Sequence, residues 1–428
     1  MDCSRVDWPP GSGSNGSDPA RQSPQHRPGS TPMHVTLFRQ VRPFGGPPTD
    51  LVAVDGVLAA APPAGARPVV VEGGGRIALP TLVDAHVHPD KTSWGEPWYS
   101  RRPAHRLPEY VAADVELYEH QRAPIGVRAH RLLAHAVTRG TRAVRAHVDV
   151  APAYGLAGVT GLREAAERLA GKLDVQSVAF PQHGVLRTPG AAELLTEAAR
   201  EHLVDAVGGI DPAGFDGGSP DGREQLDLLF DLAERYGVLL DVHLHDRGAT
   251  GLGPLRALAA RTVAAGLQGR VTVSHAFCLP ELPAPELAAT ADVLAAAGIA
   301  LTTVAPSAHQ VLPFRDLRAR GLRIGLGSDG VRDSWSPYGN ADMLHRAHLL
   351  GWTTDARTDR ELTDCLELAA HGGAELLGLP RADLTPGTPA DFLLVDGECT
   401  PQVVVDLPPR ELVVKAGRVV AEQGTLVD

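Results

Sequence analysis

The feature of this sequence that most limits its fold is the regular alternation of short apolar runs with longer segments of helical periodicity. Segments such as 161–173 (GLREAAERLAGKL) and 222–237 (GREQLDLLFDLAERYG) have apolar residues at helical spacing. The runs between them are apolar nearly throughout, as in strands buried on both faces of a parallel sheet. Those runs are VRAHVDV (144–150), DVQSVAF (174–180), DAVGGI (205–210), VLLDVHLH (238–245), RVTVSHA (270–276), IALTTV (299–304) and LRIGLGSD (322–329). With the run that ends in DAHVH (84–88), eight strands are expected, and they predict an α/β fold, a closed (β/α)₈ TIM barrel.

The two ends of the chain have a different pattern. Residues 33–80 and 384–428 contain hairpin-like pieces (LVAVDGVL, ADFLLVDG, ELVVKAGRVVAEQG) with Asp-Gly and Ala-Gly turns. Neither segment is long enough to form a sheet domain alone, so together they predict a small β-sandwich beside a barrel of residues 81–383. Residues 1–32 are rich in Gly, Ser, Pro and Arg and lack hydrophobic periodicity, so we expect disorder there, and a start codon assigned too early, with translation from Met33, is the preferred interpretation.

Composition narrows the possible partners and the compartment. The 40 basic and 51 acidic side chains give a net charge of −11, which argues against nucleic acid or an anionic membrane surface as a partner. A small-molecule substrate is expected, with a homo-oligomer as a possible assembly. The four cysteines (Cys3, Cys278, Cys365 and Cys399) form no CxxC pair, which favours free thiols in a reducing cytoplasm and excludes a cytidine-deaminase type of zinc site.

Metal-capable side chains stand at the expected carboxyl ends of several strands, where TIM barrels carry their functional groups. His86 and His88 share a face of the first strand, because residues i and i+2 of a strand point the same way. The fifth strand ends with His243, the sixth with His275 and the eighth with Asp329. Three imidazoles and a carboxylate suit zinc or ferrous iron with one position open for water. A lone histidine near a strand end is more often structural, but burying so many polar groups without a function is costly.

Several stretches of the sequence resemble, in order, those of the cytosine deaminase branch of the amidohydrolase superfamily. LPTLVDAHVHPDKT (79–92) resembles the metal-binding first-strand motif of that branch. The runs VRAHVDV and VAFPQHG resemble its second and third strands, and DVHLHD, VTVSHA, GLGSDG and WSPYGNADML (335–344) resemble its fifth, sixth and eighth strands and the loop that follows. The flanking β segments are similar to the composite sandwich of the family.

The resemblance implies roles for individual residues. His86, His88, His243 and Asp329 would bind one divalent ion, zinc or iron, and His275 would hydrogen-bond the attacking hydroxide or the developing oxyanion. Gln182 would bind the amide-like edge of the substrate ring. The residue three positions after the fifth-strand histidine is usually a glutamate that shuttles protons, and here it is Asp246.

Asp246 is one methylene shorter than the glutamate it replaces, so it needs a small backbone shift or an intervening water to reach the same proton. The alternatives are that His245 shares the proton transfer or that the enzyme is impaired. Gly330 and His183 also depart from the family pattern where substrate would lie, so cytosine itself is not singled out.

Other residues have more than one interpretation. The fourth-strand run DAVGGID lacks the lysine of binuclear members of the superfamily, which favours a mononuclear centre. Lys91 is expected to be solvated or to support the ligands, and His147 with Asp149 either orients a ligand imidazole or belongs to a polar core. Trp335 either walls the pocket or packs its loop, and His309 is a further candidate for substrate contact.

These residues together predict a hydrolytic deaminase for an amino-substituted heterocycle such as a pyrimidine, purine, pterin or triazine. Asp246 would move a proton from water to a ring nitrogen, and Asp329 would pass the remaining proton to the departing amine. The same groups open cyclic amides or imides, so a ring-opening amidohydrolase is the alternative. A catalytically impaired, metabolite-binding barrel is the second alternative.

Overall fold

The computed structural model describes residues 33–305 and 310–427. The predictions made for residues 1–32 and for His309 lie outside this part of the chain.

A sheet of parallel strands carries the site. In the described residues it has eight strands, hydrogen-bonded in the order in which they occur in the sequence. They are β6 (Leu82–Val87), β7 (Thr141–Asp149), β8 (Asp174–Phe180), β9 (Ala206–Ile210), β10 (Leu239–His243), β11 (Val271–Ser274), β12 (Ala300–Thr303) and β13 (Arg323–Leu326). The first and last strands meet through a parallel bridge between Val87 and Asp329 and a hydrogen bond of 2.8 Å from Asp329 N to His86 O. The predicted (β/α)₈ barrel is therefore confirmed.

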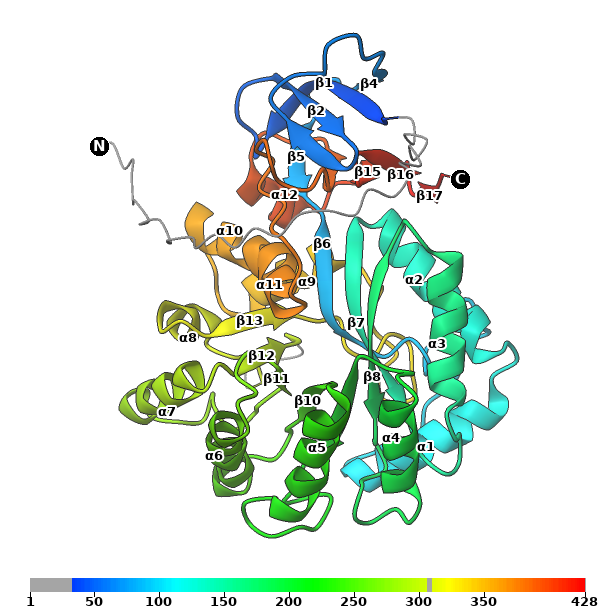
Figure 1. Cartoon of the computed structure of the whole chain (residues 1–428), viewed down its shortest axis with the longest axis vertical. Coiled ribbons are helices and arrows are strands. Elements are labelled where there is room, and N and C mark those ends of the chain that lie inside the picture. Colours follow the sequence, from blue (N-terminus) through cyan, green and yellow to red (C-terminus); the bar gives the residue numbers. More distant parts are fainter. Residues whose placement is uncertain (1–32, 306–309, 428) are drawn as a thin grey trace, which may run out of the picture. The chain divides into compact units, whose positions relative to one another are not determined.

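The strands are as deeply buried as their sequences predict. Every residue of β6 and β7 is buried, because the helices that link the strands cover the outside of the barrel (Figure 1). The helices are α1 (Leu107–His120), α2 (Ile125–Thr138), α3 (Ala157–Arg168), α4 (Ala191–Arg200), α5 (Arg223–Tyr236), α6 (Gly248–Ala264), α7 (Ala284–Ala296), α8 (Phe314–Ala319), α9 (Met343–Thr353), α10 (Asp359–Glu367), the π-helix η1 (Leu368–Gly372), α11 (Gly373–Leu376) and α12 (Thr400–Asp406).

The two helices predicted explicitly from the sequence are present with shifted ends. Helix α5 matches the segment 222–237 to within one residue at each end. Helix α3 begins at Ala157 and stops at Arg168, whereas the prediction was 161–173. It stops early because Gly171 adopts a φ of 76°, a left-handed conformation that a continuing helix does not allow.

The flanking segments build a second sheet. Within the described residues it has nine strands, in the order β17-β16-β15-β14-β5-β1-β2-β3, with β4 paired to β1. They are β1 (Val35–Pro43), β2 (Thr49–Val54), β3 (Val57–Ala59), β4 (Val69–Glu72), β5 (Ile77–Pro80), β14 (Phe392–Val395), β15 (Arg410–Lys415), β16 (Arg418–Glu422) and β17 (Thr425–Leu426). The two ends of the chain thus form the predicted composite β structure.

Strand β1 explains how one sheet makes two layers. Residues before its bulge pair with β4, and Arg42 and Pro43 beyond the bulge pair with β5. A strand that changes partners at a bulge forms the corner of a sandwich. Phe38 of β1 and Phe392 of β14 meet edge to face inside it, with ring centroids 4.8 Å apart.

The sandwich contacts the end of the barrel at which the strands begin. Arg142, near the start of β7, forms a buried ion pair of 2.7 Å with Asp391 beside β14. Lys415 of β15 donates a hydrogen bond of 2.6 Å to Asp174, the first residue of β8. The opposite end, where the strands finish, is left for the site. A search of the described helices finds none of the length and apolar character needed to cross a membrane.

Candidate metal centre and its cavity

The four predicted ligands lie together at the carboxyl ends of the barrel strands. The Nε2 atom of His88 is 3.2 Å from Nε2 of His86 and 3.5 Å from Nε2 of His243. The Oδ1 atom of Asp329 is 3.3 Å from Nε2 of His88 and 3.6 Å from Nε2 of His86. The three imidazoles are buried, at 4 % exposure or less.

These separations fit a coordination sphere. Ligands about 2.1 Å from a common ion at tetrahedral angles are about 3.4 Å from each other, and zinc–imidazole bonds are about 2.0–2.1 Å long. Neutral imidazole nitrogens that face one another without a shared cation or proton repel, because both present lone pairs. Burial lowers the pKa values of His86, His88 and His243, which keeps these rings neutral and able to coordinate.

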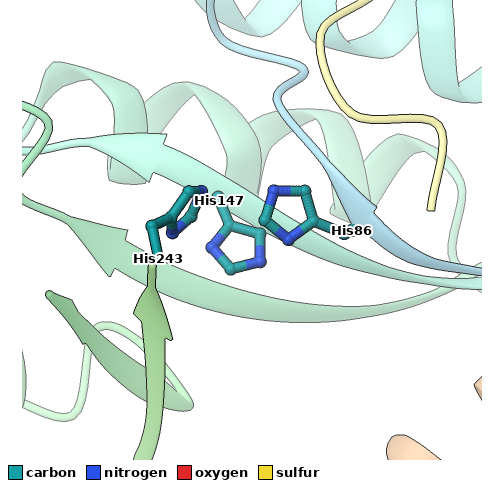
Figure 2. Close-up of side chains that lie close together, drawn as sticks. All are labelled: His86, His147 and His243. Carbon is teal, nitrogen blue, oxygen red and sulfur yellow. The ribbon is translucent and has the colours of Figure 1, made fainter. Parts of the chain in front are cut away.

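Two further histidines border this cluster. Figure 2 shows His86, His147 and His243 projecting toward one another from β6, β7 and β10, and each offers a ligand atom within 4.8 Å of the others. His86, His275 and Asp329 form a second such group. The ring of His147 lies against that of His86, with centroids 4.0 Å apart, and its Nε2 is 3.8 Å from Oδ2 of Asp241. His147 therefore supports the ring of His86 and lies in the polar core of the barrel.

A chain of hydrogen bonds fixes the orientation of His86. Its Nδ1 is 3.0 Å from the hydroxyl of Ser274, and that hydroxyl donates to Oδ1 of Asp241 at 2.7 Å. Because the single hydroxyl proton goes to Asp241, Ser274 accepts from His86, so Nδ1 carries the proton and Nε2 presents its lone pair to the cluster. Arg145 donates to the other oxygen of Asp241 at 2.9 Å and neutralises the buried charge.

His275 lies at the end of β11 with an unengaged ring. Neither ring nitrogen has a hydrogen-bond partner among the described residues, although the residue is only 2 % exposed. Burial, reinforced by the neighbouring His245, lowers the pKa of His275 to about 3, so the ring is neutral. His275 and Asp329 both have a positive φ, 72° and 60°, and such strain in non-glycine residues often marks functional sites.

His245 and Asp246 point to different surroundings. Nδ1 of His245 is 2.9 Å from Oδ2 of Asp211, the residue that follows β9, and its ring lines the cavity described below. The carboxylate of Asp246 accepts a hydrogen bond of 2.8 Å from Gly214 N, and Asp246 is absent from the lining of that cavity. Of these two residues, His245 is the one that faces the cavity, with Asp211 behind it.

A cavity of about 610 Å³ opens over the cluster. His88, His243, His275 and Asp329 form its floor, and Phe180 at the end of β8 stacks on the ring of His243 with centroids 3.8 Å apart. Pockets of several hundred Å³ suit small organic ligands. The cavity thus brings a candidate substrate next to the metal-capable side chains.

One wall of the cavity combines a cation with an amide. The predicted residues Gln182 and Trp335 lie here, together with Lys91, whose ammonium donates to Oε1 of Gln182. Gln182 in turn donates to Asp114 of α1, which also accepts a hydrogen bond of 2.7 Å from the Trp335 indole. Lys91 is only 9 % exposed, which excludes the solvated alternative considered for it. Its burial opposes protonation, but Asp149 and Asp114 raise the pKa of Lys91 above its usual value, so it is charged.

Sequence reasoning missed the parts played by Lys91, Asp114 and Asp211. Asp211 directly follows the fourth expected strand, so the rule that found the other strand-end residues could have found it. Lys91 follows the HxH pair by three positions, but the direction of a loop side chain is not set by local periodicity. No signal in the sequence marked Asp114, which reaches the site from helix α1.

The chain is similar in sequence and in fold to several known proteins. A family model described as "Amidohydrolase family" matches residues 69–421. The N-isopropylammelide isopropyl amidohydrolase of Pseudomonas sp. strain ADP is 31 % identical, and the match covers 83 % of this chain and 89 % of that protein. The solved N-isopropylammelide isopropylaminohydrolase from Burkholderia multivorans is 38 % identical with a TM-score of 0.85, covering 92 % of this chain and 100 % of that one. The solved 5-methylcytosine deaminase from Klebsiella pneumoniae is 26 % identical with a TM-score of 0.77, covering 90 % and 97 % of the two chains.

Proposed function

The chain belongs to the amidohydrolase family and is a hydrolase of carbon–nitrogen bonds other than peptide bonds, and from this premise we propose that it releases an amine from an amino- or alkylamino-substituted nitrogen heterocycle. The observation that carries the proposal is the position of His88. Its Nε2 atom lies 3.2–3.5 Å from three other ligand atoms, at the floor of a cavity large enough for a heterocycle.

We assign one divalent ion, zinc or iron, to His86, His88, His243 and Asp329. The Nε2 atom of His88 lies within 3.5 Å of a donor atom of each of the other three, whereas the groups that contain His147 or His275 have donor atoms within 4.8 Å of one another. The chemistry that such an ion supplies when bound is the activation of water, whose pKa falls toward neutrality. The fourth strand, β9, carries no lysine for a second ion and is followed by Asp211, which supports a mononuclear centre.

His245 is assigned the proton transfer that the sequence suggested for Asp246. An imidazole that faces the cavity and is hydrogen-bonded at its far nitrogen to a carboxylate is suited to take a proton at Nε2 and return it. Asp211 fixes the ring by accepting from its Nδ1, as a third group orients the base in many hydrolases. Asp329 remains the candidate to pass a proton to the departing amine.

We assign to His275 the stabilisation of the negative charge that develops on oxygen during the reaction. It is neutral and its ring nitrogens are free of other partners in the described residues, so a proton on the nitrogen nearest the reacting carbon stabilises negative charge that develops there. We assign to Lys91 and Gln182 the binding of the substrate ring. A cation and an amide side by side favour a ring with oxo or hydroxyl groups and acceptor nitrogens.

The substrate class follows from the cavity wall and from the relatives. Enzymes named for N-isopropylammelide and 5-methylcytosine act on nitrogen heterocycles, and the match to the former covers more than four fifths of this chain. We therefore place alkylamino- and amino-substituted triazines first and aminopyrimidines and pterins second. The chain is further proposed to act in the cytoplasm, alone or as a homo-oligomer.

The test is a screen of purified, metal-loaded protein against amino- and alkylamino-substituted triazines, pyrimidines, purines and pterins, with the released ammonia or alkylamine measured. Release that is lost in Asp329→Asn supports the proposal. Opening of cyclic amides or imides without amine release would favour the ring-opening alternative. Binding of heterocycles without turnover would favour an impaired, metabolite-binding barrel.

A further inference from the structure

Lys91 borders a second, smaller cavity beside the active site. It lies between the loop after β6, helix α1 and the segment from the end of β7 to α3, and its volume is about 20 Å³. A buried water needs roughly 10–15 Å³, so the cavity has room for one or two molecules or ions of the size of water. The polar side chains in its wall include Asp90, Asp114, Asp149 and Tyr154.

Two of these carboxylates are incompletely hydrogen-bonded. Asp149 is 2 % exposed; the Lys91 ammonium lies 3.2 Å from its Oδ1, but neither of its oxygens accepts a hydrogen bond within the described residues. Asp90 is 5 % exposed; its Oδ2 accepts from Asp149 N at 2.8 Å, but its Oδ1 has no such partner in the same part of the chain. A buried carboxylate oxygen without a donor is costly, so these three oxygens call for a ligand that carries positive charge or donates hydrogen bonds.

The charges around this cavity do not balance. Asp90, Asp114 and Asp149 are opposed by Lys91, whose Nζ is 3.2 Å from Asp149 Oδ1 and 3.7 Å from Asp114 Oδ2. Arg128 adds a second positive charge beside Asp90, where it donates to the main-chain oxygen at 2.8 Å. With all three carboxylates ionised, one negative charge remains. Burial, reinforced by Asp90, raises the pKa of Asp149 well above its usual value, so Asp149 keeps a proton when no ion is bound. One monovalent cation would replace that proton and balance the charge, whereas a divalent ion would reverse its sign.

We propose that this cavity binds one monovalent cation of about the size of water, ammonium or potassium, between Asp90 and Asp149. Tyr118, Gln121 and Ile125 line both this cavity and a groove of about 620 Å³ that is more open to solvent, so the two lie side by side. Ammonium and potassium share the charge and radius that the cavity requires. The binding itself does not depend on the proposed function.

The ion has a consequence for the active site. Lys91 is shared between Asp149 on one side and Gln182 on the other. A cation beside Asp149 replaces part of that attraction and leaves Lys91 free to bind the substrate ring. This consequence, unlike the binding, rests on the proposed function.

Thermal unfolding of the metal-loaded full chain tests the binding, because a ligand of the native state raises Tm. Melts are compared in ammonium, potassium, lithium and choline chloride at equal ionic strength. Ammonium or potassium is expected to raise Tm by about 2 °C or more over choline. A larger effect of ammonium indicates a site for a reaction product, and a larger effect of potassium a structural ion. Equal Tm values in all four salts would overturn the proposal.

Single substitutions test whether the cation binds in this cavity. Asp149→Asn is expected to abolish the salt-specific rise in Tm. Asp205→Asn, which alters a carboxylate that accepts from Ser177 away from the cavity, is expected to keep it. If Asp149→Asn does not fold, Gly158→Ala serves instead, because a Cβ there would lie 3.1 Å from the main-chain oxygen of Asp149 and 3.3 Å from Asp90 Oδ2 and would narrow the cavity without changing its charge. A salt-specific rise in Tm that is undiminished in the variant that alters the cavity would contradict the proposed cation site.

Discussion

Nδ1 of His245 lies 2.9 Å from Oδ2 of Asp211, and this contact joins the residues that follow two neighbouring barrel strands. The other oxygen of Asp211 accepts from the main-chain nitrogens of His245 and Asp246, so the carboxylate holds both the ring and its backbone. The ring of His245 lies 5.7 Å from that of His243 and 4.6 Å from that of His275, centroid to centroid, whereas the carboxylate of Asp246 accepts a hydrogen bond from Gly214 N. The side chain next to the cluster is therefore an imidazole with a carboxylate behind it.

The first prediction separates His245 from Asp246. His245→Asn and Asp211→Asn are expected to lower kcat about 100-fold or more, since positioned acid–base groups contribute factors of that size. Asp246→Asn keeps an oxygen for Gly214 N and is expected to lower kcat less than about fivefold. Steady-state kinetics with the most active substrate of the screen measures kcat of each variant. A larger loss of kcat in Asp246→Asn than in His245→Asn would indicate that Asp246 transfers the proton.

The second prediction concerns the hydrogen bond that orients His86. Ser274→Ala removes the hydroxyl that accepts the Nδ1 proton of His86. It is expected to weaken metal binding about 10- to 100-fold, because loss of a hydrogen-bond partner of a metal-ligating histidine has an effect of that size in metalloproteins. Competition with a chromogenic chelator measures the affinity. Ser177→Ala is the matched control, because its hydroxyl donates to Asp205 away from the cluster. Equal affinities of the two variants would argue against the orienting role of Ser274.

The third prediction tests the cavity wall. Lys91→Gln removes the charge next to Gln182 and is expected to raise KM about 10- to 100-fold, since hydrogen bonds to charged groups are worth about 1.5–3 kcal/mol. Lys172→Gln, at the turn between α3 and β8, is the control and is expected to leave KM unchanged. An unaltered KM in Lys91→Gln would mean that Lys91 does not contact the substrate.

The fourth prediction uses Asp333, a buried residue of the cavity wall. Burial, reinforced by Asp114, raises the pKa of Asp333 to about 7 from its ordinary value of 3.8. The native state therefore keeps a proton that the unfolded chain loses, so this residue makes stability fall as the pH rises from about 4 to 7. Asp333→Asn is expected to match the wild type at pH 4 and to exceed it at pH 8 by a few kcal/mol, since one pKa unit is worth about 1.4 kcal/mol. Denaturant unfolding at both pH values measures this, and equal stabilities at pH 8 would refute it.

The barrel and the histidine cluster could be predicted from the sequence for the same reason. Each strand is a continuous apolar run, and His86, His88, His243 and His275 stand at the ends of such runs. Parallel strands in a barrel bring those ends together whatever the length of the helices between them. The eight strands, the closed barrel and the paired flanking β segments could therefore be predicted without coordinates.

The wall of the cavity could not be predicted in the same way. Asp114 comes from helix α1, and Lys91 and Trp335 from loops, whose course depends on tertiary packing that local periodicity does not describe. The choice between His245 and Asp246 required the direction of two side chains just beyond a strand. The family pattern favoured Asp246, and only the contacts with Asp211 and Gly214 distinguish the two.

The central claim is that one divalent ion is held by His86, His88, His243 and Asp329, and metal analysis of the purified protein tests it most directly. His88 is the residue to change, because its Nε2 lies within 3.5 Å of a ligand atom of each of the other three. We expect about one equivalent of zinc or iron per chain in the wild type and less than about a tenth of that in His88→Ala with the fold intact by circular dichroism. A folded His88→Ala that retains a full equivalent, or a wild type that binds none after loading, would contradict the account.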